Sequence, residues 1–129
     1  LSQAYRMMPR LFLAIGAIAA GLAVAAGAFG AHGLESRVTP ERLETFKTGV
    51  AYHMYHALAL LIVAWAATQW PGSSVTWAGY CFVGGIVVFS GSLYALVLTD
   101  TPWLGAITPL GGVAFIVGWA LLAWSVLRG

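Results

Sequence analysis

The chain has 129 residues, of which 60% are hydrophobic and 8% are charged, and its formal net charge is +2. Water-soluble domains carry roughly 25% charged residues, so this composition excludes a soluble globule and indicates a protein embedded in a lipid bilayer. Six basic and four acidic side chains are too few for a nucleic-acid-binding surface. The length predicts a single domain covering residues 1–129.

The first predicted span covers about residues 11–30 and follows Arg6 and Arg10. It has the ~20 apolar residues that a helix needs to cross the hydrocarbon core. Because it exceeds the ~7–15 apolar residues of a signal peptide, we expect a retained span. Small residues recur in it at spacings of three and four, which allows close helix packing. These residues are Gly16, Ala20, Gly21, Ala25, Ala26, Gly27 and Gly30. Packing within the chain is the favoured interpretation, and a dimer face is the alternative.

A charged, amphipathic segment leads into the second span. Thr39-Pro40-Glu41 is a typical helix start, with Thr as the N-cap, Pro at the first helical position and an acid in the first turn. We expect residues 40–48 to form an interfacial helical segment. No helix breaker follows, so the segment continues directly into a second span at about residues 49–68.

Two further spans complete the prediction, at about residues 77–98 and 104–127. Thr101-Pro102 and Thr108-Pro109 both carry the cap-then-proline signal, which predicts a short helical prelude before the last span. The fold class is therefore all-α, an integral membrane four-helix transmembrane bundle. Both termini are expected on the same side of the membrane.

Charge counting does not decide the orientation of the bundle. The terminal side holds Arg6, Arg10 and Arg128, and the other side holds Arg37, Arg42 and Lys47. The count ties at three each, and a cytoplasmic location of the termini is only our preference.

The few polar groups are predicted to gather at one membrane face. His32 ends the first span, His53 and His56 begin the second, and Asp100 ends the third, with Glu35, Tyr52, Tyr55 and Thr108 nearby. Ionisable groups at membrane depth are costly and often mark function. The i, i+3 spacing of His53 and His56 also places them on nearly one side of a helix.

This expected cluster has three interpretations. It is a structural polar cluster that locks helix ends together, which we favour, or a proton or ligand path, or a metal or haem site with His32 as the third ligand. An H-x-x-H pair alone is a weak motif. The chain has no activated nucleophile pattern, phosphate loop or carboxylate pair, so we expect no enzymatic activity, no catalytic residue, no metal and no cofactor.

Four blocks of the sequence carry a resemblance to a known family. They are GAFGAHGL (27–34), FKTGVAYHMYHALALL (46–61), FSGSLYAL (89–96) and WLGAITPLGGVAFIVGW (103–119). Together they resemble the YwdK/YgdD-like family of small membrane proteins, a domain-of-unknown-function family. The resemblance implies four membrane helices, in bacteria in the inner membrane, and it implies no established activity.

The predicted function is that of a structural or accessory membrane subunit acting through helix–helix contacts. Its expected partners are the lipid bilayer and either further copies of itself, in a homo-oligomer, or a larger membrane complex. The alternative is a membrane binding module for a cofactor, metal or small ligand, which uses the histidine cluster.

Overall fold

The structure is a computed structural model that describes residues 3–129, with side chains from Met7 onward; the side chain of Arg6 lies outside the described part. The described residues are all-α, with no strand, as predicted. The elements are α1 (Gln3–Phe29), η1 (Gly30–Leu34), α2 (Pro40–Gln69), α3 (Ser73–Gly85), η2 (Ile86–Ser90), α4 (Gly91–Thr99), η3 (Pro102–Ala106) and α5 (Thr108–Arg128).

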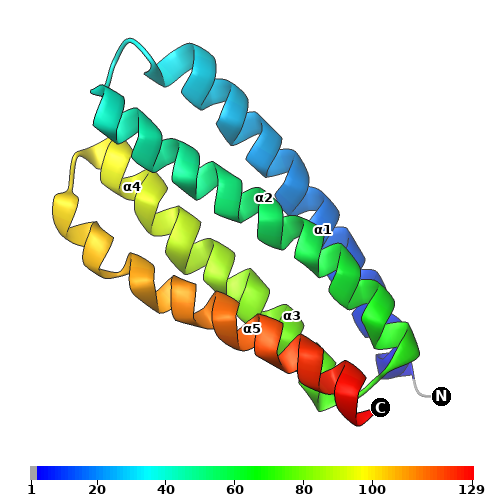
Figure 1. Cartoon of the computed structure of the whole chain (residues 1–129). Helices are drawn as coiled ribbons and strands as arrows, with labels where there is room; N and C mark the ends of the chain where they lie inside the picture. The colour runs from blue at the N-terminus through cyan, green and yellow to red at the C-terminus, as the bar shows by residue number, and fades with distance from the viewer. Residues whose placement is uncertain (1–2) are drawn as a thin grey trace.

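These elements form four helical stretches that are long and apolar enough to cross a membrane. They are Met7–Leu34, Pro40–Gln69, Ser73–Thr99 and Pro102–Arg128. Each of them contains one predicted span. The described ends of the chain lie together at one end of the bundle (Figure 1), and the loop between α2 and α3 lies at that end as well.

The start of α2 follows the predicted capping chemistry. The backbone N–H of Arg42 donates to Thr39 Oγ1 over 3.2 Å, and Pro40 occupies the first helical position. The helix then runs for 30 residues without interruption. At 1.5 Å per residue it is about 45 Å long, close to the ~40–45 Å of a bilayer with its headgroups. Residues 40–48 are thus the first turns of α2 and share one axis with the span.

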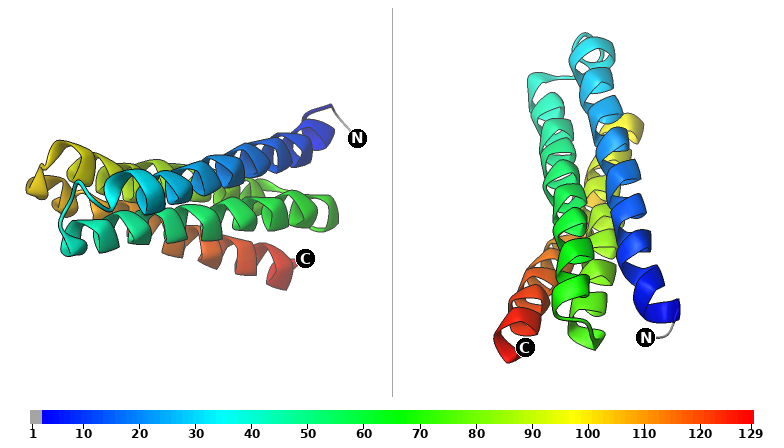
Figure 2. Two further views of the ribbon diagram at one scale, coloured as in Figure 1. Left: turned by 90° about the horizontal axis from the view of Figure 1, so that it is seen from above. Right: turned by 90° about the vertical axis from the view of Figure 1, so that its right-hand side faces the viewer.

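The helices are arranged with α1 and α5 on opposite flanks and α2 and α3–α4 between them (Figure 2). Within the described residues α1 packs mainly on α2, and near the terminal end it also contacts α3, where the Phe12 ring lies against Gly79 and Tyr80. A Cβ added at Gly16 would lie 2.9 Å from the Ala57 carbonyl oxygen of α2, whereas one added at Gly21 would meet nothing within 4 Å. The small residues of α1 therefore serve in part to bring α1 against α2, and Gly21 points away.

The core has two apolar clusters, and the buried polar side chains of the described residues lie between them except for Ser125, near the terminal end. One apolar cluster includes Phe12, Leu60, Val63, Val75 and Phe82 near the terminal end, and the other includes Leu34, Phe46, Leu96 and Val97 at the opposite end. The buried side chains of His53, His56, Ser90 and Ser92 lie at the level between them. Each is hydrogen-bonded within the chain, as buried polar groups in hydrocarbon must be.

The helix of α3 and α4 contains one turn of π-helix, η2. Ser90 at its end donates to the Gly49 carbonyl oxygen of α2 over 2.7 Å. Phe89 presents its backbone to Gly111 of α5, where an added Cβ would lie 2.7 Å from Phe89 Cα. This segment therefore holds α2 and α5 on its two sides.

Candidate functional site

The structure divides the four residues that were predicted to form one cluster. His53 and His56 are buried near the middle of α2, whereas His32 and Asp100 are exposed at the end of the bundle. His53 follows Pro40 by 13 residues, so it lies about 20 Å along the helix axis from that end. The described residues contain no group of three His, Cys, Asp or Glu side chains placed to hold a metal ion.

The residues expected beside the cluster are also dispersed. Glu35 and Tyr55 are exposed. The backbone carbonyl of Tyr52 bonds to His56, while Thr108 Oγ1 bonds to Ser92 Oγ over 2.6 Å. The physical reason for the division is that residues 40–48, expected to lie along the membrane face, continue into the span on one helix axis, which places both histidines near the middle of the bundle.

His56 connects α2 to α5 with both of its ring nitrogens. Nδ1 lies 2.8 Å from the Tyr52 carbonyl oxygen, and Trp119 Nε1–H donates to Nε2 over 3.1 Å. Since a carbonyl only accepts, the ring proton is on Nδ1 and His56 is neutral. The ring also stacks on Phe115, with centroids 3.5 Å apart. Neither nitrogen is left for a metal or ligand.

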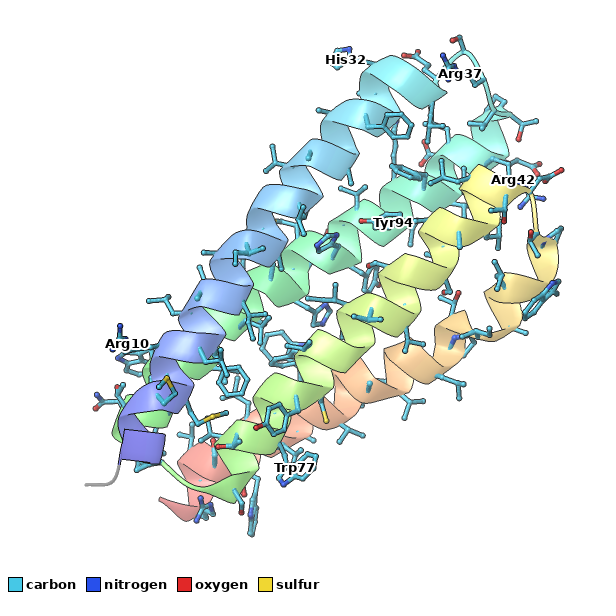
Figure 3. The ribbon with its side chains drawn as sticks, turned by 180° about the vertical axis from the view of Figure 1, so that it is seen from behind. Arg10, His32, Arg37, Arg42, Trp77 and Tyr94 are labelled. Atoms are coloured by element: carbon cyan, nitrogen blue, oxygen red, sulfur yellow. The ribbon has the colours of Figure 1, made fainter. Side chains whose placement is uncertain are left out.

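His53 connects α2 to α4 through a residue that the sequence analysis did not single out. Its Nδ1 lies 2.8 Å from the Tyr94 hydroxyl. Figure 3 shows Tyr94 directed from α4 towards α2. The His53–Tyr94 contact could have been predicted from the sequence, because a buried tyrosine hydroxyl usually has a polar partner and few polar side chains occur in the middle of the spans.

A groove lies over this His53–Tyr94 pair, between α1 on one side and α3–α4 on the other. We call it the lateral groove; its volume is about 430 Å³, and almost none of its lining is polar. Its lining residues are Ile15, Ile18, Ala19, Leu22, His53, Leu60, Val83, Ile86, Val87, Gly91 and Tyr94. The groove exists because α1 packs along α2 and contacts α3 only near the terminal end, at Phe12, so the side of α3–α4 beyond that contact is left uncovered.

The chemistry of the lateral groove is that of a hydrocarbon site. His53 Nδ1 and the Tyr94 hydroxyl face each other, and almost none of the lining is polar, so the groove offers a ligand little to hydrogen-bond. Its volume falls in the ~300–1,000 Å³ range of small-molecule pockets. A Cβ added at Gly91 would meet nothing within 4 Å, so the groove has open space beside this glycine.

A second cavity, which we call the interfacial cleft, lies at the end of the bundle opposite the termini. Its volume is about 930 Å³, and its lining is half polar and half apolar. Arg37, Glu41, Arg42 and Asp100 supply its charges, and Arg42 Nη2 lies 3.2 Å from Asp100 Oδ1. Figure 3 shows Arg37 and Arg42 at this end, with His32 pointing away from the bundle.

The four apolar helices with their polar, hydrogen-bonded centre define a small integral membrane protein. Residues 26–112 match the family described as "Protein of unknown function (DUF423)", and the chain belongs to this family. It is 52% identical over 120 residues to the UPF0382 membrane protein YwdK of Bacillus subtilis, covering 92% of this chain and 98% of that protein. It is 48% identical over 119 residues to the UPF0382 membrane protein SAB0533 of Staphylococcus aureus, covering 92% and 97%. No solved structure matches the chain.

Proposed function

We propose that this protein is a membrane-embedded binding module that holds the hydrocarbon chain of a lipid-type molecule in the lateral groove. The observation that carries this proposal is the groove itself, which is apolar, about 430 Å³ in volume, and formed by helices that do not close over it. Apolar side chains from three helices give the hydrocarbon chain of a lipid more van der Waals contact than the face of a single helix would. A ligand that already resides in the bilayer also needs no aqueous route to the site.

The position of the groove supports a binding role over a metal or haem role. Its α2 residues are His53 and Leu60, and His53 Nδ1 is engaged by the Tyr94 hydroxyl. His56, the other buried histidine, has both nitrogens engaged. The small-ligand version of the binding hypothesis is therefore the one that the geometry supports best.

The test is to purify the protein in a mild detergent and to measure retained lipid by native mass spectrometry. Gly91→Leu places a side chain into the open space of the groove and should abolish stoichiometric lipid retention. Gly84→Leu is the matched control, because an added Cβ there also meets nothing within 4 Å and Gly84 does not line the groove.

A second blocking variant keeps the test valid if Gly91→Leu misfolds. Val87 is 67% exposed and lines the groove, so Val87→Trp should block it from its rim. Both blocking variants are compared with wild type by circular dichroism. Wild-type protein that carries no lipid, or folded blocking variants that retain as much lipid as Gly84→Leu, would overturn the proposal.

An accessory or self-associating role is the second candidate, and one feature of α1 favours it. Ala17, Gly21 and Ala25 are exposed at spacings of four on the side away from α2, which suits close approach of another helix. Gly21→Leu should therefore reduce the size of the assembly in gentle detergent. Gly16→Leu is unsuitable for this purpose, because it would disturb the packing of α1 on α2. An unchanged assembly size for Gly21→Leu would remove this candidate.

The proposal includes a location in the bacterial cytoplasmic membrane. Proteins that span the bacterial outer membrane are typically β-barrels, whereas this chain is a helical bundle. Fractionation of the two membranes of a Gram-negative host, with the protein detected by an epitope, tests this location. Recovery in the outer membrane would contradict it.

A further inference from the structure

The lateral groove and the interfacial cleft lie one after the other along the same two helical stretches. On the α1 side, the groove is lined by residues up to Leu22 and the cleft is lined by Phe29 and Leu34. On the opposite side the groove ends near Tyr94, and the cleft begins at Val97. The same two helical stretches, α1–η1 and α3–α4, therefore form both sides from mid-membrane to the bundle end.

Resting on the proposed function, we infer that the bound molecule is a zwitterionic phospholipid with a primary ammonium group. Its head lies in the interfacial cleft, and the end of an acyl chain lies in the lateral groove. Three features support this assignment: the distance between the two cavities, the small residues between them, and the charged side chains of the cleft.

The spacing of the two cavities fits one leaflet of a bilayer. Leu34 in the cleft and Leu22 at the near rim of the groove are 12 residues apart, which is about 18 Å along the helix. Half of a bilayer's hydrocarbon core is about 15 Å, and the head lies beyond that. A phospholipid with its head at the level of Leu34 therefore brings its chain ends to the groove.

Between the α1 residues that line the groove and those that line the cleft, α1 carries the small side chains of Ala25 and Ala26. Ala25 is exposed and Ala26 is half-buried, so these two positions add little bulk between the two cavities. Ala26 packs against the cluster that contains Leu34 and Val97. The cavity lining changes from half polar at the bundle end to almost wholly apolar at mid-depth, which is the order of groups along a phospholipid.

The charges of the cleft match a head that carries both signs. Arg37 and Arg42 supply two cations, and Glu41 and Asp100 supply two anions. Within the described residues Arg37 makes no ion pair, so its guanidinium is available for a phosphate. Asp100 has an 85% exposed side chain and bonds Arg42 through one carboxylate oxygen, which leaves the other for an ammonium N–H. An anionic lipid would offer no cation to Glu41 or to the second carboxylate oxygen of Asp100.

The experiment is a competition on the full chain. Delipidated protein is mixed with equimolar phosphatidylethanolamine and phosphatidylglycerol of identical acyl chains, and the ratio of bound lipids is measured by native mass spectrometry. One interfacial ion pair predicts a preference of about two- to fivefold for phosphatidylethanolamine in the wild type. A phosphatidylcholine competitor, which has no ammonium N–H, should bind more weakly than phosphatidylethanolamine.

Asp100→Asn tests the ammonium contact. Asp100 has φ = 51°, a left-handed conformation that Asn also adopts readily, so the turn is preserved. This variant should lose or reverse the preference, because Arg42 and Arg37 then face the head without Asp100. Arg37→Gln should weaken retention of both lipids. Lys47→Gln is the matched control, since Lys47 is an exposed cation of α2 outside the cleft.

The outcomes separate this inference from the proposed function. If wild type retains lipid and Gly91→Leu does not, but the head preference is absent, favours phosphatidylglycerol or survives Asp100→Asn, the head assignment is wrong and the groove proposal stands. If wild type retains no lipid at all, both are wrong.

Discussion

Adjacent glycines in this chain should respond in opposite ways to the same small substitution. Gly111 and Gly112 are neighbours in α5, yet a Cβ at Gly111 would fall on the backbone of Phe89, while one at Gly112 would lie 3.9 Å from the Phe89 ring. Backbone atoms of a packed helix cannot give way locally, so Gly111→Ala has to separate α5 from η2. Ordinary van der Waals contact at Gly112 requires no movement.

The expected magnitudes follow from two opposing effects. Overpacking a tight contact costs about 1–3 kcal/mol. Replacing a helical glycine by alanine gains up to about 1 kcal/mol of helix propensity, and this gain is common to both positions. Gly111→Ala should therefore lower the free energy of unfolding by about 1–2 kcal/mol, and Gly112→Ala should leave it unchanged or raise it by up to about 1 kcal/mol.

The assay is reversible unfolding in mixed micelles of mild detergent and dodecyl sulfate, followed by circular dichroism. A second pair repeats the comparison: a Cβ at Gly85 would fall on the ring of Phe115, and one at Gly84 would meet nothing within 4 Å. Phe115 cannot easily move, because His56 stacks on it. Equal effects within about 0.5 kcal/mol in both pairs would refute the packing of α5 against α3 and η2 described above.

Three further predictions concern the polar centre. Tyr94→Phe should lower the free energy of unfolding by about 1 kcal/mol. A double-mutant cycle with His53→Phe should yield a coupling energy of about 0.6–1.7 kcal/mol. Additive effects of the two substitutions would contradict the hydrogen bond between His53 and Tyr94. Trp119→Phe should lower the free energy of unfolding by about 1 kcal/mol, because His56 Nε2 loses its hydrogen-bond donor. The same variant should retain as much lipid as wild type, and loss of lipid from it would argue against the lateral groove as the binding site. Treatment with a strong chelator should leave the melting temperature unchanged and elemental analysis should find less than stoichiometric metal, since the described residues gather no three-ligand group; a chelator-induced shift would contradict this.

Several elements of the fold follow directly from local sequence chemistry. The Thr39 cap and Pro40 predicted where α2 begins. The Thr101-Pro102 and Thr108-Pro109 pairs predicted a short prelude, which is the 3₁₀ helix η3, before α5. Neither Thr101 nor Thr108 makes a side-chain cap hydrogen bond, so at these two starts the proline alone carries the signal. A cap or a proline acts within its own turn and needs no information from distant residues.

The candidate site was harder to predict, because it depends on where helices lie along one another. We expected His53 and His56 at a membrane face because the last charge before them is Lys47. Residues 40–48 instead share one straight helix with the span, so the histidines lie near mid-bundle, about 20 Å along α2 from Pro40. Tyr94 and the lateral groove depend on the placement of α1 and α4 around α2. Hydropathy along one chain carries little information about that placement.

The π-helical turn η2 has a consequence for how this chain can change in length. A π turn accommodates one residue more than an α turn in the same rotation, so it absorbs an extra residue without turning the helix beyond it. Deletion of one residue from 86–90 would convert the π turn into an α turn and leave the following helix facing nearly the same way. Tyr94 would stay beside His53, and Gly91 would stay in the groove. Single-residue deletions should therefore be tolerated better here than within α4, where a deletion would rotate every later residue by about 100°.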